Sequence, residues 1–410
     1  MGQLLDAAFQ FDVETGQPPV AVPACAQLST PVGSPVQLDT VNTLSDFSAL
    51  ADEWALLSQN STSRVSVFQS FTWLRHWVDS YVSSPGSNHQ LAIVTGRAAD
   101  GRLVLVAPFQ LERNGLVAHL CWMGCPVAQY GDVLVSSEYD NAQNIGEALS
   151  VAIQTFKPDV VGLSKVRDDN RLAKALANGW ALELCRDTAH ELAFGASDRF
   201  SEYEKRYSSK SRKNRRRLLR RLQENHKVGF HQHAPGDQAA RIAQAGLELK
   251  RAWLKSRGLL SAALNQEVVG DLLISLARDP SSGCAVFSVT CDDRIVGVQL
   301  GFQHQGKLEL YLIVYDLEFE KSGVGSLHLE DTFREACDRG VAIVDLLAPD
   351  AVYKREWADV SMGVRDYARP CSLVGRMYIA IYMIGVRKLL KRAQSMLPLK
   401  WRKLAIRLVR

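Results

Sequence analysis

The chain has 410 residues, more than one hydrophobic core usually supports, so its length predicts two domains. With 47% hydrophobic and 22% charged residues it has the composition of an ordinary globular protein. The net charge of +4 is too mild for a protein that binds duplexes over its whole surface. No stretch reaches the roughly 18 apolar residues of a membrane span, which excludes an integral membrane protein.

The eight cysteines include no CxxC pair. Cys121 and Cys125 lie four positions apart, but no second Cys or His pair follows at the spacing of a zinc site. We therefore expect reduced thiols and no metal. The first residues lack the charged start and apolar run of a signal peptide, and Asp6 stands where a myristoylation signal needs Ser or Thr. These features predict a cytoplasmic protein, at most peripheral at the inner face of the membrane.

Residues 1–38 are rich in Pro, Gly, Gln and Ser without periodicity and predict a flexible N-terminal arm. One pattern then occurs twice: a Trp-bearing helix, three short strands, a helix and a strand. In the first predicted domain (39–195) the segments are 71–82, 90–96, 102–110, 116–123, 141–155 and 159–163. In the second (196–375) they are 243–258, 284–290, 294–302, 307–315, 324–340 and 341–347. The pattern predicts a duplicated α+β unit of meanders joined at hairpin signals such as Asp100-Gly101, although two generic halves could resemble each other by chance.

The loop "EFEKSGVGS" (318–326) joins the last meander strand of the second domain to the following helix. Gly323 and Gly325 allow a tight turn that a ligand can approach, and the first residues of the helix, Val324 and Ser326 among them, point free N–H groups toward it. Taken alone, the motif is as typical of a plain tight turn as of a ligand-binding loop. It is not a dinucleotide-binding fingerprint, because the third Gly is missing.

A meander followed by a Gly-turn, a helix and a strand is the order of the GNAT acyltransferase core. The run from Glu320 to Gly325 resembles that family's Gln/Arg-x-x-Gly-x-Gly/Ala pyrophosphate loop, with Glu320 as the departure. Together with the segments 68–81, 207–222 and 345–357, it makes residues 45–375 similar to acetyltransferases of the cellulose-biosynthesis CelD type, relatives of the Fem peptidyltransferases. The resemblance implies two tandem GNAT-like domains, each a mostly antiparallel sheet flanked by helices. It also implies acetyl-CoA, or another acyl-CoA, bound at Gly323–Ser326.

Catalytic candidates follow in the same half. The resemblance implies that Lys354 of "VYKREW" lies near the reacting carbonyl, where it could stabilise an oxyanion or hold a phosphate; the alternative is a surface lysine. Tyr353 and Trp357 would fix its loop. Asp345 ends a buried strand and could accept a proton from an incoming amine, or could cap the next loop.

Further polar residues lie along the meander strand 307–315. Glu309 and Tyr311 share a face by the period of two, and Tyr315 and Asp316 lie beside the Gly-turn. The sequence does not choose a base among these groups. In the first domain Tyr130 and Asp132 could dock a second substrate or form a structural turn. The first domain lacks a GxG loop, which predicts one acyl-donor site, in the second domain.

Two segments are strongly basic. Between Lys205 and Arg221, ten of seventeen residues are Lys or Arg. This run is typical of a solvated helix face or of a contact with tRNA or a nucleotide-sugar phosphate. No recognition motif accompanies the charge, so specific DNA binding is not expected. The tail 376–410 has no acidic residue and is basic and amphipathic, which favours an anionic membrane surface or packing along the enzyme.

The sequence thus predicts an acyltransferase that moves an acyl group, most simply acetyl, to an amine or hydroxyl. The expected acceptor is a sugar or a precursor of the cell envelope or of an exopolysaccharide. Two alternatives stay open: an aminoacyl-tRNA-dependent peptidyltransferase of the Fem type, and a non-catalytic scaffold in polysaccharide biosynthesis.

Overall fold

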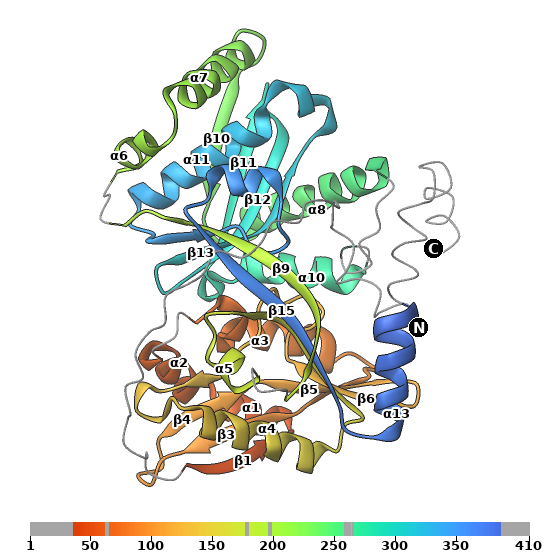
Figure 1. Cartoon of the computed structure of the whole chain (residues 1–410). Helices are drawn as coiled ribbons and strands as arrows, with labels where there is room; N and C mark the ends of the chain where they lie inside the picture. Colours follow the sequence, from red (N-terminus) through yellow and green to blue (C-terminus); the bar gives the residue numbers. More distant parts are fainter. Residues whose placement is uncertain are drawn as a thin grey trace.

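The computed structural model describes residues 36–61, 65–176, 180–195, 199–257, 264 and 266–386. The predicted arm up to residue 35 and the tail from residue 387 lie outside the described residues. Within the described part, no helix is long and apolar enough to cross a membrane. Most elements of the two sequence halves form a lower and an upper group in Figure 1, and the end of the described chain returns beside the lower group.

The first half contains the whole of the smaller sheet and five of the eleven strands of the larger one. Its elements are β1 (Gln37–Val41), α1 (Leu44–Ala49), α2 (Ala51–Asn60), η2 (Val67–Gln69), α3 (Phe71–Trp77), η3 (Val78–Val82), β2 (His89–Leu91), β3 (Ile93–Arg97), β4 (Leu103–Ala107), β5 (Phe109–Asn114), β6 (Val117–Trp122), β7 (Leu134–Val135), η4 (Ser137–Tyr139), α4 (Ala142–Phe156), β8 (Val160–Arg167), α5 (Arg171–Leu176) and β9 (Leu182–Ala193). The predicted helix 71–82 is α-helical only to Trp77 and continues as a π-helical turn.

The second half repeats the order of a meander, a helix and a strand. Its elements are α6 (Phe200–Tyr203), η5 (Glu204–Arg206), α7 (Ser209–Gln223), β10 (Val228–His233), α8 (Asp237–Arg257), α10 (Glu267–Arg278), η6 (Pro280–Ser282), β11 (Cys284–Cys291), β12 (Arg294–His304), β13 (Lys307–Tyr315), η7 (Leu317–Ser322), α11 (Val324–Asp338), β14 (Ile343–Asp345), α12 (Val352–Trp357), β15 (Val360–Pro370), α13 (Leu373–Tyr378) and η8 (Ile379–Val386).

Both halves contribute to one sheet of eleven strands, ordered β10-β11-β12-β13-β14-β9-β15-β8-β6-β5-β2, and a smaller sheet has the order β1-β3-β4-β7. The pairs β6–β8 and β13–β14 are parallel, and the other named strand pairs are antiparallel. Each parallel pair follows the predicted meander and helix of its half. The predicted α+β fold class with two GNAT-like halves is confirmed.

Turn chemistry explains where the meanders fold back. In the second half the turns Asp292-Asp293 and Gln305-Gly306 both have two successive residues at positive φ, the conformation of a two-residue type I′ hairpin. In the first half, the predicted strands 90–96 and 102–110 each divide between the two sheets. The divisions lie at Ala92 and at Pro108. Because proline has no N–H to donate to a β-ladder, Pro108 interrupts the pairing of its strand.

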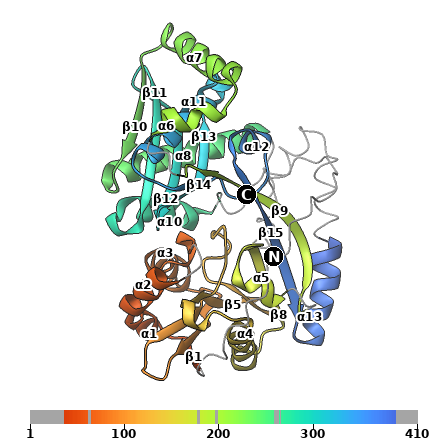
Figure 2. The ribbon, with the colours of Figure 1, turned by 60° about the vertical axis from the view of Figure 1, so that its left-hand side comes forward.

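Strands β9 and β15 join the two halves and cross from one to the other in Figures 1 and 2. The end of β9 pairs with β14 of the second half, whereas β15 pairs with β8 of the first. The largest apolar core is also shared, since it contains Trp54 and Trp73 together with Leu272 and Val298. The predicted boundary at residues 195/196 stays a prediction, but the halves pack as one body.

Candidate functional site

The parallel pair β13–β14 separates soon after it begins. Its register runs only from Lys307–Ile343 to Glu309–Asp345. Strand β13 then continues to Tyr315, while the chain after β14 stays with β9 through the hydrogen bond that Leu346 N donates to His190 O. The edge of β13 beyond Glu309 is therefore not covered by β14.

The predicted Gly-turn stands at the end of this edge. Gly323 has a φ of +79° and precedes α11 without a side-chain cap. A Cβ on Gly323 would lie 2.8 Å from Leu218 of α7, and one on Gly325 would lie 2.8 Å from the ring of Tyr315. The two glycines thus allow α7 and Tyr315 to pack directly on the turn. The N–H groups at the start of α11 point out of the helix end, which favours a negatively charged ligand.

Arginines compensate the acidic residues before the turn. Glu320, the departure from the GNAT pattern, pairs with Arg257 at the end of α8. Asp316 and Glu318 both pair with Arg294, and Glu318 lies 2.8 Å from it. Asp316 also caps η7 by accepting from Glu318 N. The charge of Glu320 is therefore paired with a cation at the protein surface.

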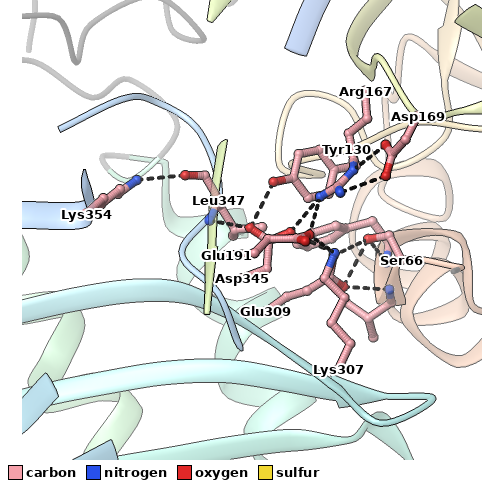
Figure 3. Close-up of polar contacts among 12 residues, drawn as sticks. Ser66, Tyr130, Arg167, Asp169, Glu191, Lys307, Glu309, Asp345, Leu347 and Lys354 are labelled. Atoms are coloured by element: carbon pink, nitrogen blue, oxygen red, sulfur yellow. Dashed lines mark hydrogen bonds and ion pairs between the residues drawn. The ribbon is translucent and has the colours of Figure 1, made fainter. Parts of the chain in front are cut away.

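Lys354 is buried, unlike the surface lysine that was the alternative. Its Nζ donates to Leu347 O at 2.9 Å and to Pro349 O at 2.8 Å, so it ties α12 to the loop after β14 (Figure 3). Burial lowers the pKa of this ammonium to about 8, although the charge of Asp345 acts in the opposite direction. Two of its three N–H groups are used, and the third has no recorded acceptor among the described residues.

The residues beside Lys354 divide into an anchor and an exposed side chain. Trp357 is buried between the rings of Phe333 and Tyr207, with centroids 5.1 and 5.2 Å away. Tyr353 keeps 38% of its surface exposed. Its hydroxyl end is nevertheless enclosed, so burial, followed by the neighbouring Tyr315, raises the pKa of this phenol to about 12.

Asp345 is the centre of a buried network of ionic groups from both halves (Figure 3). Its Oδ2 lies 2.7 Å from Lys307 Nζ and 2.9 Å from an Arg167 nitrogen. Its Oδ1 accepts from Tyr130 Oη at 3.1 Å and from Leu347 N at 2.7 Å. Burial alone would raise the pKa of this carboxyl, but the two cations hold it below its usual value. Since both oxygens are occupied, the geometry favours the loop-capping alternative over a general base.

Glu309 and Tyr311 both point from β13 toward the first half. The Glu309 carboxylate accepts from Ser66 Oγ at 2.7 Å and from Val67 N at 2.8 Å. Burial raises the pKa of Glu309, and Lys307 partly offsets that effect. Tyr311 Oη donates to Val127 O at 3.1 Å. The two side chains hold the halves together, while their catalytic role stays a prediction.

The first-half candidates are also buried. The Tyr130 ring lies under the Arg167 guanidinium, 5.1 Å from its centroid, and its hydroxyl reaches Asp345. Asp132 accepts from Val133 N at 2.8 Å, and burial raises the pKa of its carboxyl to about 7. Tyr130 joins the network of the second half. Asp132 lies in the irregular segment before β7, and its role in docking a substrate stays a prediction.

The sequence reasoning missed three members of this network: Arg167, Glu191 and Lys307. Arg167 also forms a two-bond pair with Asp169, at 2.9 and 3.0 Å, and all three missed residues are buried. Lys307 and Glu309 alternate at the start of β13, which was a usable signal for a polar face. Arg167 and Glu191 stand in strands with no motif, so only the sheet order brings them together.

The basic helix α7 lies directly against the Gly-turn. Its buried residues are Arg215 and Leu222, and Arg215 pairs with Glu330 of α11 at 2.8 Å. A shallow hollow at its N-terminal end is lined by Ser208, Lys210, Ser211, Lys213, Asn214 and Arg217. The remaining cations are mostly exposed, so the helix presents a positive surface beside the turn.

Comparison with known proteins supports one family for part of the chain. Residues 209–355 match the family described as acetyltransferase (GNAT) domain. Comparison with curated sequences gives no match.

Two solved structures share the fold along most of the chain. FemX, at 10% identity, has a TM-score of 0.55 and covers 81% of this chain and 98% of its own. The C-terminal domain of a putative lysylphosphatidylglycerol synthetase from Agrobacterium fabrum, also at 10% identity, has a TM-score of 0.50 and covers 81% and 97%. A tandem GNAT protein from the clavulanic acid pathway aligns at 12% identity with a TM-score of 0.44, covering 82% and 99%. The match of residues 209–355 to a GNAT acetyltransferase domain supports the predicted acyltransferase.

Proposed function

We propose that the protein transfers an acyl group from acyl-CoA, most simply acetyl-CoA, to an amine or hydroxyl group. The observation that carries this proposal is the early end of the β13–β14 pairing. Beyond Glu309 the uncovered strand edge offers backbone groups for the amides of an extended pantetheine, and it leads to the N-terminus of α11 at Gly323. The diphosphate of the donor would bind there, and its thioester would point back along β13.

Lys354 would act on the developing charge of the reaction. Its pKa of about 8 allows an ammonium at neutral pH, and its third N–H is available to an oxyanion. The carboxylates of Asp345 and Glu309 are enclosed by cations and donors and are less suited to receive a proton. Tyr315, beside the Gly-turn, and Tyr353, on α12, would position the acyl group.

The proposed acceptor is a sugar or a precursor of the cell envelope or of an exopolysaccharide. This choice rests on the resemblance of three segments to the CelD type, including the loop with Lys354.

A second candidate is transfer from an aminoacyl-tRNA. The observation that favours it is the position of α7, whose Leu218 packs on Gly323 while its exposed cations face outward. A polyanion larger than coenzyme A would bind such a helix and still reach the turn. The shared fold with FemX is consistent with this candidate.

Thermal unfolding with added ligand distinguishes the donors, because a ligand that binds the native state raises its stability. The full chain would be titrated with acetyl-CoA, with coenzyme A and with charged tRNA. A rise in melting temperature with acetyl-CoA, and release of free coenzyme A thiol in the presence of an amino sugar, supports acyl-CoA transfer. A rise with tRNA alone favours the second candidate. If neither ligand raises the melting temperature, both donors are refuted and the non-catalytic scaffold is the remaining alternative.

A further inference from the structure

A cluster of metal-binding side chains lies in the first half, away from the proposed donor site. Glu112 on β5 and His119 on β6 are direct cross-strand partners, and Cys121 follows two residues later on the same face. One ligand atom from each of the three lies within 4.8 Å of the other two. All three residues belong to strands of the large sheet, and each is at most 9% exposed.

Within the described part of the chain, His119 is the member of the cluster whose polar atoms lack hydrogen bonds. Its side chain is 8% exposed, and neither ring nitrogen has a hydrogen-bond partner among the described residues. A buried imidazole normally pairs at least one nitrogen, because leaving water without a new partner is unfavourable. The neighbouring strand makes room for this ring: a Cβ on Gly162 of β8 would lie 2.1 Å from His119 Nε2.

Cys125 is a candidate fourth ligand next to Cys121, outside the group of three whose ligand atoms lie within 4.8 Å of one another. Cys125 follows Cys121 in the loop after β6, and the two thiols are hydrogen-bonded to each other. Cys125 Sγ also lies 3.6 Å from Ser164 Oγ. The cluster therefore offers nitrogen, sulfur and oxygen donors in the combination that zinc accepts in tetrahedral sites.

We propose that Glu112, His119 and Cys121 bind a transition-metal ion of the Zn²⁺ class, with Cys125 as the fourth ligand. Tetrahedral coordination at about 2.0 to 2.3 Å needs ligand atoms about 3.5 Å apart, so the side chains would close by about 1 Å on binding. Each cysteine gives up its thiol proton to solvent on binding the ion, and the imidazole binds in its neutral form.

The position of the cluster indicates a structural role. Cys121 and Cys125 flank the start of the loop that carries Val127 and Tyr130. Val127 O accepts the hydrogen bond from Tyr311, and the Tyr130 hydroxyl reaches Asp345. A metal ion at the base of this loop would fix the segment through which the first half contacts the second.

Cobalt substitution tests the site in the full chain. Protein treated with a chelator would be titrated with Co²⁺, and the absorption from thiolate-to-cobalt charge transfer would be recorded beside the bound metal per chain. The variants are Cys121→Ser and His119→Gln, and Cys284→Ser on β11 is the matched control, since it is another buried cysteine on a strand. We expect wild type and control to bind one Co²⁺ with the charge-transfer band. Cys121→Ser should weaken the band, and both cluster variants should bind at least about tenfold more weakly.

Binding of no Co²⁺ by wild type, or an unchanged affinity in His119→Gln, overturns the proposal. Substitutions in the sheet can prevent folding, so circular dichroism would be measured first. If either variant is unfolded, Glu112→Gln, which keeps the shape of the side chain, takes its place. A Zn²⁺-dependent rise in wild-type melting temperature that Glu112→Gln abolishes supports the site, and an equal rise in both overturns it.

Discussion

Replacing Lys354 by Met tests both its burial and its proposed chemistry. The side chain is 6% exposed, and its pKa falls from 10.5 to about 8 chiefly because of burial. At about 1.4 kcal/mol for each pKa unit, the folded state disfavours the charged form by about 3 kcal/mol. The sign follows from proton linkage: the folded chain binds this proton more weakly than the unfolded chain, so the full penalty is present below about pH 8 and disappears as the pH rises toward 10.5.

The measured quantity is the free energy of unfolding in urea, for wild type minus Lys354→Met, at several pH values. Between about pH 7 and about pH 9.5, wild type should gain about 2 kcal/mol relative to the variant. The hydrogen bonds to Leu347 and Pro349 are lost at every pH, so they shift the whole curve without changing its slope. Lys227→Met, at a side chain that is 82% exposed, is the control and should give a flat difference.

A flat curve for Lys354→Met would refute the buried ammonium. Single-turnover acyl transfer tests the chemistry separately. If Lys354 stabilises the oxyanion, the variant should lose about a hundredfold in rate while its affinity for acetyl-CoA changes little, and Lys354→Arg should restore part of the rate. An unchanged rate would leave Lys354 as a structural tie between α12 and the loop after β14.

Three further outcomes are expected. Gly325→Val should abolish the acetyl-CoA-dependent rise in melting temperature, because the valine side chain would meet the Tyr315 ring. The control Gly146→Val, in open space on α4, should keep the rise, and an equal rise in both variants would exclude the turn as the donor site. Asp345→Asn should lower the free energy of unfolding in urea by about 3 to 5 kcal/mol, and a loss under about 1 kcal/mol would contradict the buried network. Removal of residues 387–410 should weaken binding to anionic vesicles in a salt-dependent manner, and equal binding by both forms would disprove a membrane role for the tail.

Local sequence signals predicted the repeated elements well, because each depends on near neighbours. The hairpin at Asp292-Asp293 and the Gly-turn at Gly323 require positive φ at defined positions, and their residue types suit that conformation. Apolar runs bounded by such turns predicted the strands on either side. The bend of two first-half strands at Ala92 and Pro108 was not predicted, because an apolar run does not show which sheet each part joins.

The candidate site was predicted less completely, because its members meet only through the sheet order. Lys307, Glu309 and Asp345 lie on β13 and β14, within the predicted unit. Arg167 comes from β8 and Glu191 from β9, and no local pattern places β9 between β14 and β15. Spacing rules for metal sites do not consider a pair such as Glu112 and His119 for a related reason: a cross-strand pair in a hairpin has no fixed sequence spacing, so the site proposed there has no sequence signal.

The buried network also explains why the matched GNAT domain depends on the first half. Asp345 and Glu309 are on strands of the second half, yet several of their partners, Arg167, Tyr130 and Ser66, come from the first. A buried carboxylate that loses its partners is strongly unfavourable, and β14 would also lose β9 as its neighbour. Residues 209–355 therefore carry the Gly-turn that is proposed to bind the donor, but not all the groups that stabilise their strands. The two halves must be kept together in any measurement of donor binding or transfer.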